Sequence, residues 1–197
     1  MNSADVKVGA VVLAAGSGKR MGSPKALLPL GESSFLGSIL RTLREVGGEE
    51  IVIVVSPALR TEIAALAPFA RLIVNPNPES DMLSSVRLGV QSIANVSGVM
   101  IVPVDHPFVQ PSTYARLMER FARNPDSVIV PTYDCRNGHP VIVPYAWACR
   151  LPEISYEGGL RAIIQHSDMQ VIQVSVDDKG VLRNINAQTD LEEGAGK

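Results

Sequence analysis

The sequence predicts an α/β protein of the Rossmann-like, doubly wound class, with a mostly parallel sheet and a mixed or antiparallel edge. Short apolar runs rich in β-branched residues alternate with amphipathic segments over the first two thirds of the 197 residues. This alternation is typical of parallel strands joined by helical crossovers. The rhythm breaks at residues 141–143, a strand-like run without a clear helix before it. We therefore expect an antiparallel or mixed element in the last third.

The individual elements follow from periodicity, β-branching and turn residues. Buried strands are expected at residues 8–15, 51–55, 71–74, 99–104 and 127–131. Helices are expected at residues 33–46, 57–66, 82–94 and 111–123, and serine or proline opens three of them. A helix at residues 160–165 and a strand at residues 171–176 should follow. An Asp/Lys/Gly turn at residues 177–180 predicts a hairpin with residues 181–182 at the sheet edge.

Composition narrows the function classes. Apolar residues make up 46% and charged residues 19% of the chain, as in ordinary globular proteins, and residues 1–197 are expected to form a single domain. The net charge of −2 argues against nucleic acid or an anionic membrane as a partner. Only Cys135 and Cys149 are present, without a C-x-x-C motif, so a zinc or iron–sulfur site is not expected. With no apolar stretch of about 20 residues, we expect a cytoplasmic protein.

The turn after the first strand predicts a polyanion site. Gly16, Ser17 and Gly18 end the apolar run, and Arg20 and Lys25 follow closely. Glycine lets the backbone approach a ligand, and clustered cations favour a triphosphate. A P-loop is excluded because arginine follows Gly18-Lys19, and a dinucleotide fingerprint fails at its third glycine position, which is methionine. An ordinary turn with solvated lysines is the structural alternative.

Residues 13–30, LAAGSGKRMGSPKALLPL, resemble the signature loop of the MobA-like NTP transferases, the nucleotidyltransferases of the molybdenum cofactor. The family pattern is L-A-A-G-x-S/G-x-R-M-G-x-x-K-x-L-L. The resemblance implies a nucleotide-diphospho-sugar transferase-like fold and a loop that wraps the triphosphate of a nucleotide. It assigns nucleotide contacts to Ala14, Ala15, Gly16, Ser17, Gly18, Arg20 and Lys25. Within that set, the bidentate fork of Arg20 suits the β- and γ-phosphates, and the point charge of Lys25 suits the α-phosphate under attack.

The same resemblance implies a Mg²⁺ site. Asp105 ends the apolar strand VPVDHP, which is similar to the family's strand ending in D-x-P, and this makes Asp105 a catalytic metal ligand. Asn186 falls on the second ligand position of a late segment, NINAQTDL, which departs from the family at Ala187-Gln188. The structural alternatives are a turn aspartate and a helix cap.

Two further segments resemble the family. Asn75, Ser84 and Ser85 match a nucleotide-contacting motif in which Asp81 replaces the usual glycine, although both serines also suit the first turn of a helix. The Gly138-His139-Pro140 sequence resembles the cytidylyltransferase branch, and Arg161 matches a following G-x-R segment. His139 and Arg161 are therefore implied to bind the acceptor, with a structural loop histidine as the alternative.

Together these matches predict a Mg²⁺-dependent cytidylyltransferase that moves CMP from CTP to the phosphate of molybdopterin and releases pyrophosphate. A guanylyltransferase, or an enzyme acting on a sugar phosphate or another small phosphorylated acceptor, would share the same loop. A non-catalytic chaperone that passes the pterin cofactor to a client molybdoenzyme is a third possibility. A nicotinamide oxidoreductase is disfavoured by the missing third glycine.

Overall fold

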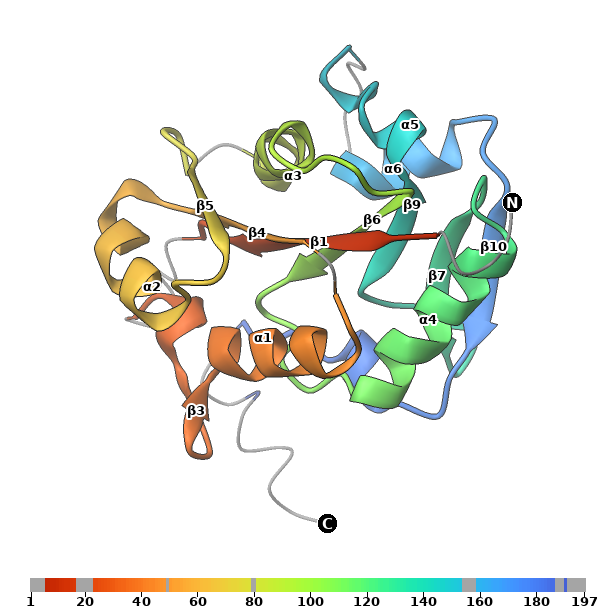
Figure 1. The fold of residues 1–197 in the computed structure, drawn as a ribbon. Coiled ribbons are helices and arrows are strands. Elements are labelled where there is room, and N and C mark those ends of the chain that lie inside the picture. The colour runs from red at the N-terminus through yellow and green to blue at the C-terminus, as the bar shows by residue number, and fades with distance from the viewer. Residues whose placement is uncertain are drawn as a thin grey trace.

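The computed structural model describes residues 6–16, 23–48, 50–78, 81–153, 159–186 and 190. Its centre is a mixed sheet with strand order β10-β7-β9-β6-β1-β4-β5, and β8 pairs with β7 off this path. Helices cover both faces of the sheet (Figure 1). The expected α/β, doubly wound and mostly parallel fold is confirmed.

The middle of the sheet is built from strands that are buried along their whole length. β1 (Val8–Ala14) lies between β4 (Ile51–Val55) and β6 (Gly98–Pro103), parallel to both. Strands covered on both faces read as continuous apolar runs, and this made these three recognisable in the sequence. The remaining parallel strands are β5 (Arg71–Val74), β7 (Val128–Tyr133) and β10 (Val171–Ser175).

The helices form one layer on each side of the sheet. On one face lie α1 (Phe35–Glu45), α2 (Arg60–Leu66) and α4 (Pro111–Arg123). On the other face lie α3 (Met82–Gln91), α5 (Tyr145–Ala148) and α6 (Gly159–Gln165) (Figure 1). Short 3₁₀ turns complete the described chain: η3 (Lys25–Leu27), η4 (Pro57–Leu59), η5 (Leu151–Glu153) and η6 (Lys179–Leu182).

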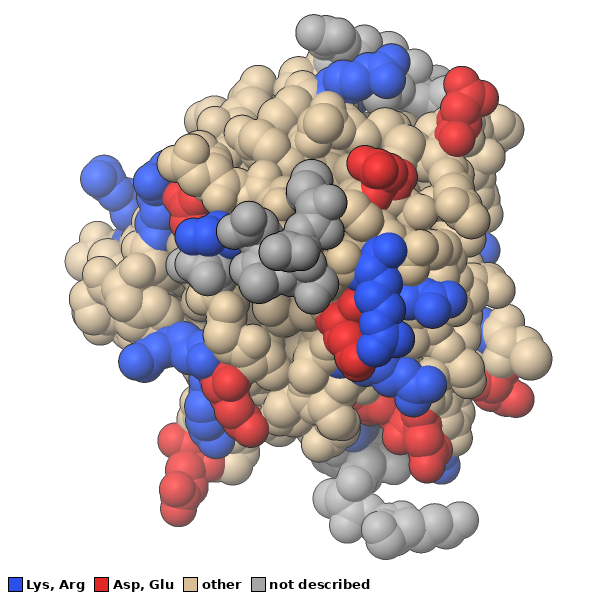
Figure 2. Space-filling view, turned by 45° about the vertical axis from the view of Figure 1, so that its right-hand side comes forward, with Lys and Arg blue, Asp and Glu red and all other residues tan. Residues whose placement is uncertain are grey.

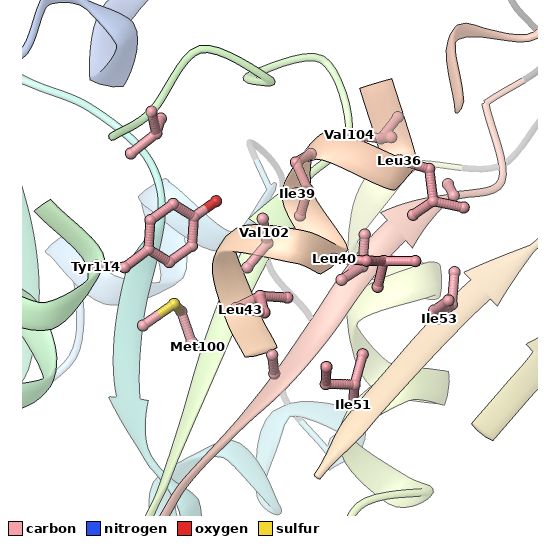
Figure 3. Close-up of a cluster of buried hydrophobic side chains, with 14 of the residues drawn as sticks. Leu36, Ile39, Leu40, Leu43, Ile51, Ile53, Met100, Val102, Val104 and Tyr114 are labelled. Atoms are coloured by element: carbon pink, nitrogen blue, oxygen red, sulfur yellow. The ribbon is translucent and has the colours of Figure 1, made fainter. Parts of the chain in front are cut away.

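The core under α1 joins segments that are far apart in the chain. Ser34 caps this helix, its hydroxyl accepting a hydrogen bond from the Gly37 N–H at 3.1 Å. Figure 3 shows the apolar stripe of α1 pointing toward side chains of β4 and β6, with Tyr114 of α4 beside it. The labelled side chains of this cluster are Leu36, Ile39, Leu40, Leu43, Ile51, Ile53, Met100, Val102, Val104 and Tyr114.

The last third differs from expectation in detail. β9 (Val141–Pro144) is antiparallel, as predicted for a mixed element, but it lies inside the sheet between β6 and β7. All four of its residues are buried, and an interior position covers them on both faces. β8 (Arg136–Asn137) forms an unexpected hairpin with β7.

The predicted hairpin after residue 176 is wrong. β10 is an edge strand parallel to β7, and the chain after it turns into η6. The cause is Asp178, whose side chain caps η6 by accepting from the Gly180 N–H at 2.8 Å. A second small hairpin, β2 (Pro29–Leu30) with β3 (Ser33–Ser34), was also not predicted. Within the described ranges, no helix has the combination of length and apolar character that crossing a bilayer requires.

Candidate functional site

The carboxyl ends of β1 and β6 lie next to each other, because the two strands are parallel neighbours in register. Ala15 and Gly16 follow β1, and Asp105 follows β6. These three residues and Lys25 line a cleft of about 220 Å³. A Cβ atom built at Gly16 would meet no atom of the described residues within 4 Å, so these residues leave the backbone open to a ligand. Ligands of open α/β sheets bind at this edge.

Lys25 contacts two other residues that the sequence singled out, Asp105 and Asn186. Its Nζ donates to Asp105 Oδ2 at 3.2 Å and to Asn186 Oδ1 at 2.6 Å. The positions of Lys25 and Asn186 are separated by 161 residues. The backbone N–H of Ile185 also donates to the Asp105 carbonyl oxygen at 2.9 Å, which holds Asn186 beside the end of β6.

The oxygen set of the cleft fits a Mg²⁺ ion. Asp105 Oδ1 is buried and has no hydrogen-bond partner among the described residues; Nε2 of His106 lies 4.0 Å away. A buried anionic oxygen without a partner is costly, and a cation would relieve that cost. Carboxylate and amide oxygens are ligands that Mg²⁺ accepts, with phosphate and water completing its shell. The described residues, those of the cleft included, contain no group of three or more His, Cys, Asp or Glu that could hold a metal, so the cleft offers one carboxylate and one amide.

The geometry also bears on the structural alternatives for Asp105. A capping or turn aspartate would use its carboxylate to bind a local N–H group. In this structure Asp105 Oδ2 accepts from Lys25, and Oδ1 has no hydrogen-bond partner in the described part of the chain. The side chain therefore faces the cleft and does not cap a turn or helix. The helix that Asn186 was alternatively expected to cap falls largely outside the described residues.

Asn75 joins the loop after β5 to the first turn of α3. Its Nδ2 donates to the hydroxyl oxygens of Ser84 at 3.2 Å and Ser85 at 2.9 Å. Asp81, the residue that departs from the family pattern, caps α3 by accepting from the Ser84 N–H at 3.0 Å. Asp81 and Ser85 also line the cleft. The three predicted nucleotide contacts therefore form one cluster, and each also has a structural role.

The two predicted acceptor residues lie in a neighbouring pocket. His139 and Arg161 both line a space of about 190 Å³ between the sheet and α6. Met82 lines this pocket and the cleft, so the two spaces adjoin. Arg161 is exposed and supplies positive charge to the pocket.

His106 was missed by sequence reasoning. Its side chain is 6% exposed and its ring centre is 5.0 Å from that of His139. Burial lowers the pKa of His106, although Asp105 opposes this effect. Burial and then His106 lower the pKa of His139 to about 4. Both rings are therefore neutral at pH 7 and offer hydrogen bonds without positive charge. The sequence signal that could have identified His106 is its position directly after Asp105.

Of the remaining predicted residues, one lies in the core and three lie outside the described part of the chain. Ala14 ends β1, is 1% exposed and is not among the residues that line the cleft, so the structure does not bring this predicted nucleotide contact to the surface of the cleft. Ser17, Gly18 and Arg20 lie outside the described residues.

The surface around α4 carries both signs of charge. Figure 2 shows Lys and Arg side chains next to Asp and Glu side chains on this face. A groove there is lined by Arg116, Arg120 and Arg123, and Arg123 forms an ion pair with Glu119 one turn away.

Comparison with known proteins gives relatives that match most of the chain. A nicotine blue oxidoreductase of Paenarthrobacter nicotinovorans is 26% identical over 187 residues, covering 89% of this chain and 90% of the relative. A probable molybdenum cofactor guanylyltransferase of Rhodopirellula baltica is 27% identical over 190 residues, covering 92% and 88%. The crystal structure of Rv0371c from Mycobacterium tuberculosis H37Rv superposes with a TM-score of 0.83 at 22% identity, covering 96% and 97%. A manganese complex of Rv0371c superposes with a TM-score of 0.79 at 23% identity, covering 95% and 97%.

A family model also matches the chain. The model of the MobA-like NTP transferase domain matches residues 10–171, a range that includes most of β1, the cleft residues Lys25 and Asp105, and both predicted acceptor residues. On that match, the chain belongs to the MobA-like NTP transferase domain family, a family of nucleotidyltransferases.

Proposed function

We propose that this protein is a Mg²⁺-dependent nucleotidyltransferase that transfers CMP from CTP to the terminal phosphate of a molybdopterin-type acceptor. The observation that carries the proposal is the convergence of Lys25, Asp105 and Asn186 at an open glycine turn, with one Asp105 oxygen unpartnered. A lysine, two oxygen ligands and an accessible backbone are the parts that nucleotidyl transfer needs.

In the proposed reaction, an oxygen of the acceptor phosphate attacks the α-phosphorus of CTP. The bond between the α-phosphorus and the bridging oxygen of the β-phosphate breaks, and pyrophosphate leaves. No covalent enzyme intermediate is needed, because the acceptor phosphate is already anionic at neutral pH. Lys25 would balance the charge that develops on the α-phosphate, and such fixed charges are a large source of rate enhancement.

Asp105 and Asn186 would hold the Mg²⁺ ion. When bound, the ion supplies charge neutralisation and alignment of the phosphates. Lys25 would remain the nearest protein cation to the same oxygens. The backbone at Ala15 and Gly16 would admit the phosphates, and Arg161 would attract the acceptor's anionic group.

The choice of CTP rests on the resemblance of Gly138-His139-Pro140 to the cytidylyltransferase branch. The guanylyltransferase name of the Rhodopirellula relative supports the competing base. A panel of CTP, GTP, ATP and UTP, with and without molybdopterin, tests this by pyrophosphate release. We expect CTP to support pyrophosphate release, and to do so only when molybdopterin is present. Equal release with CTP and GTP would contradict the base assignment and leave the reaction class intact.

The metal assignment is tested in the same assay. Asp105→Ala should abolish pyrophosphate release without unfolding the protein, because it removes the charged ligand. Asp126→Ala, which removes an exposed aspartate before β7, is the matched control and should keep wild-type turnover. Full turnover in the Asp105 variant would exclude the proposed metal site.

One observation favours a second candidate function. The relative from Paenarthrobacter nicotinovorans is named as an oxidoreductase and matches nearly the whole chain. Incubation with NADH or NADPH and a quinone-type dye, followed by nicotinamide absorbance, tests this candidate. Nicotinamide oxidation without pyrophosphate release in the NTP panel would favour it over nucleotidyl transfer.

A further inference from the structure

A groove of about 240 Å³ lies between α4 and the edge strand β10, hereafter the α4–β10 groove. α4 and β10 are close together at the end of the sheet opposite β5 (Figure 1). The helix contributes the three arginines Arg116, Arg120 and Arg123 to the lining, and the strand contributes residues 173–175. The groove shares no described lining residue with the cleft at the carboxyl ends of β1 and β6, so it is a separate feature of the surface.

The backbone of β10 is open to pairing on its outer side. β10 is the last strand of the sheet, and no described strand pairs with it there. The Gln170 carbonyl oxygen accepts from the Val128 N–H at 2.9 Å, and in a parallel pair every second residue turns both backbone groups toward its neighbour. The backbone N–H and C=O groups of Val171, Gln173 and Ser175 therefore point to the open side.

The sequence of β10, VIQVS, lacks the residues that usually protect an edge strand. Edge strands that stay unpaired commonly carry lysine, other charges or proline. β10 contains no charged residue and no proline, and its Val171 is 40% exposed. The opposite edge strand, β5, begins with the charged and exposed Arg71. Of these two edges, β10 is the one suited to accept another strand.

The arginines of α4 leave positive charge in the groove. Arg123 forms an ion pair with Glu119. Arg116 and Arg120 form no ion pair with a described residue, and like charges four residues apart destabilise a helix. The helix dipole accounts for Arg120 and Arg123, which lie in the last turn, but not for Arg116. An anionic partner would balance this charge.

The spacing of the arginines fits acidic side chains on an added strand. Arg116 and Arg120 are about 6 Å apart along the axis of α4, and alternate side chains of an extended strand are about 6.7 Å apart. The residues between the acidic ones would lie on the opposite face, where Val171 is exposed. Nucleic acid fits less well, because no described lining residue is an aromatic that could stack on a base, and Glu119 would repel phosphates.

We propose that the α4–β10 groove is a docking site for an extended segment of a partner protein in which acidic and apolar residues alternate. The segment would add a strand to β10 through backbone hydrogen bonds, and its carboxylates would pair with Arg116 and Arg120. Backbone pairing supplies affinity, and the arginines select acidic segments. The inference is independent of the proposed reaction, because the groove is separate from the cleft.

A fluorescein-labelled peptide, TEVEVET, tests the inference when it is titrated into the full chain and its anisotropy is followed. We expect saturable binding that weakens as NaCl is raised from about 50 to about 500 mM. Arg116→Glu and Arg120→Glu should each weaken binding at least about fivefold, because each replaces an attraction by a repulsion. Arg60→Glu, at an exposed position of α2, makes the same change in net charge and should bind within about twofold of the wild type.

The backbone contribution is tested separately. Ser175→Pro removes an N–H group from the open side of β10 and no hydrogen bond to β7, and proline is tolerated at such edge positions. This variant should bind TEVEVET at least about fivefold more weakly than the wild type. The peptide TEPEPET, which keeps the three glutamates but cannot pair as a strand, should show a similar loss. Thermal unfolding checks that each variant is folded, and TEPEPET carries this test if Ser175→Pro unfolds.

Four results would overturn the inference: no saturable binding of TEVEVET, equal binding of the basic peptide TKVKVKT, the same loss in Arg60→Glu as in Arg116→Glu, or undiminished binding of TEPEPET. Tighter binding of oligothymidylate than of TEVEVET would assign the groove to nucleic acid and would also contradict it. Pyrophosphate release by Arg116→Glu should equal that of the wild type. Failure of the NTP panel would therefore contradict the proposed reaction and leave the docking site standing.

Discussion

His139 is a residue whose environment makes the stability of the protein depend on pH. Its pKa is lowered to about 4, first by burial and then by the neighbouring His106. The unfolded chain therefore binds a proton at His139 below about pH 6.5, whereas the folded chain binds it only below about pH 4. The contribution of His139 to the free energy of unfolding is complete above about pH 6.5 and is lost as the pH falls from about 6.5 to about 4. A shift of this size corresponds to about 3 kcal/mol of unfolding free energy.

The prediction is a shallower pH dependence in His139→Gln. Denaturant unfolding of wild type and variant between pH 7 and pH 4 should give curves whose difference changes by about 3 kcal/mol over that range. His166→Gln, at an exposed position after α6, serves as the control and should keep the wild-type slope. Parallel curves for wild type and His139→Gln would show that His139 is not held neutral by the fold.

At the scale of elements, Asp178 connects η6 to the start of α4. One carboxylate oxygen accepts from the Gln110 N–H at 2.9 Å and the Thr113 hydroxyl at 2.7 Å, and the other accepts from the Gly180 N–H at 2.8 Å. The side chain is 8% exposed, so it is shielded from water. A single carboxylate thus fixes the segment that leads to Asn186 against the loop that follows Asp105.

Asp178→Ala should lower the free energy of unfolding by about 2–4 kcal/mol, because three donors lose their acceptor in a buried place. Equilibrium urea unfolding measures this change. The neighbouring Asp177 is exposed, and Asp177→Ala should change stability by less than about 0.5 kcal/mol. Similar effects of the two substitutions would mean that the buried hydrogen bonds do not carry the stability assigned to them.

At the scale of the whole molecule, one core joins both halves of the chain. Leu36 of α1 is fully buried in the cluster that also contains Met100 of β6 and Tyr114 of α4 (Figure 3). Leu36→Ala should cost about 2–5 kcal/mol, the sum of lost apolar burial and the cavity left behind. Thermal unfolding should show a single cooperative transition at a lower midpoint. Leu66→Ala, at a 39% exposed position, should leave the midpoint nearly unchanged. An equal loss in both variants would contradict the role of this core.

The sequence was sufficient wherever the information is local. α4 has the predicted bounds, Pro111–Arg123, because a proline in the first turn and a 3.6-residue apolar period are set by near neighbours. For the same reason a serine, Ser33 or Ser34, was predicted to open α1, and Ser34 caps it. The glycine turn and Lys25 also form one short motif, and the family that this motif indicated is the one to which the chain belongs.

Tertiary structure decided what depends on residues far apart in the chain. The interior place of β9, the capping of η6 by Asp178 and the burial of His106 beside His139 arise from contacts between distant segments, which no local pattern encodes. The pocket between the sheet and α6 likewise needs β6, β7, β9 and α6 together. The sequence by itself determined most of the helices and buried strands, the family and the residues that carry charge. Only packing decided that Asp105 and Asn186 meet at Lys25, because that meeting depends on the order of the strands and on the path of the chain after β10.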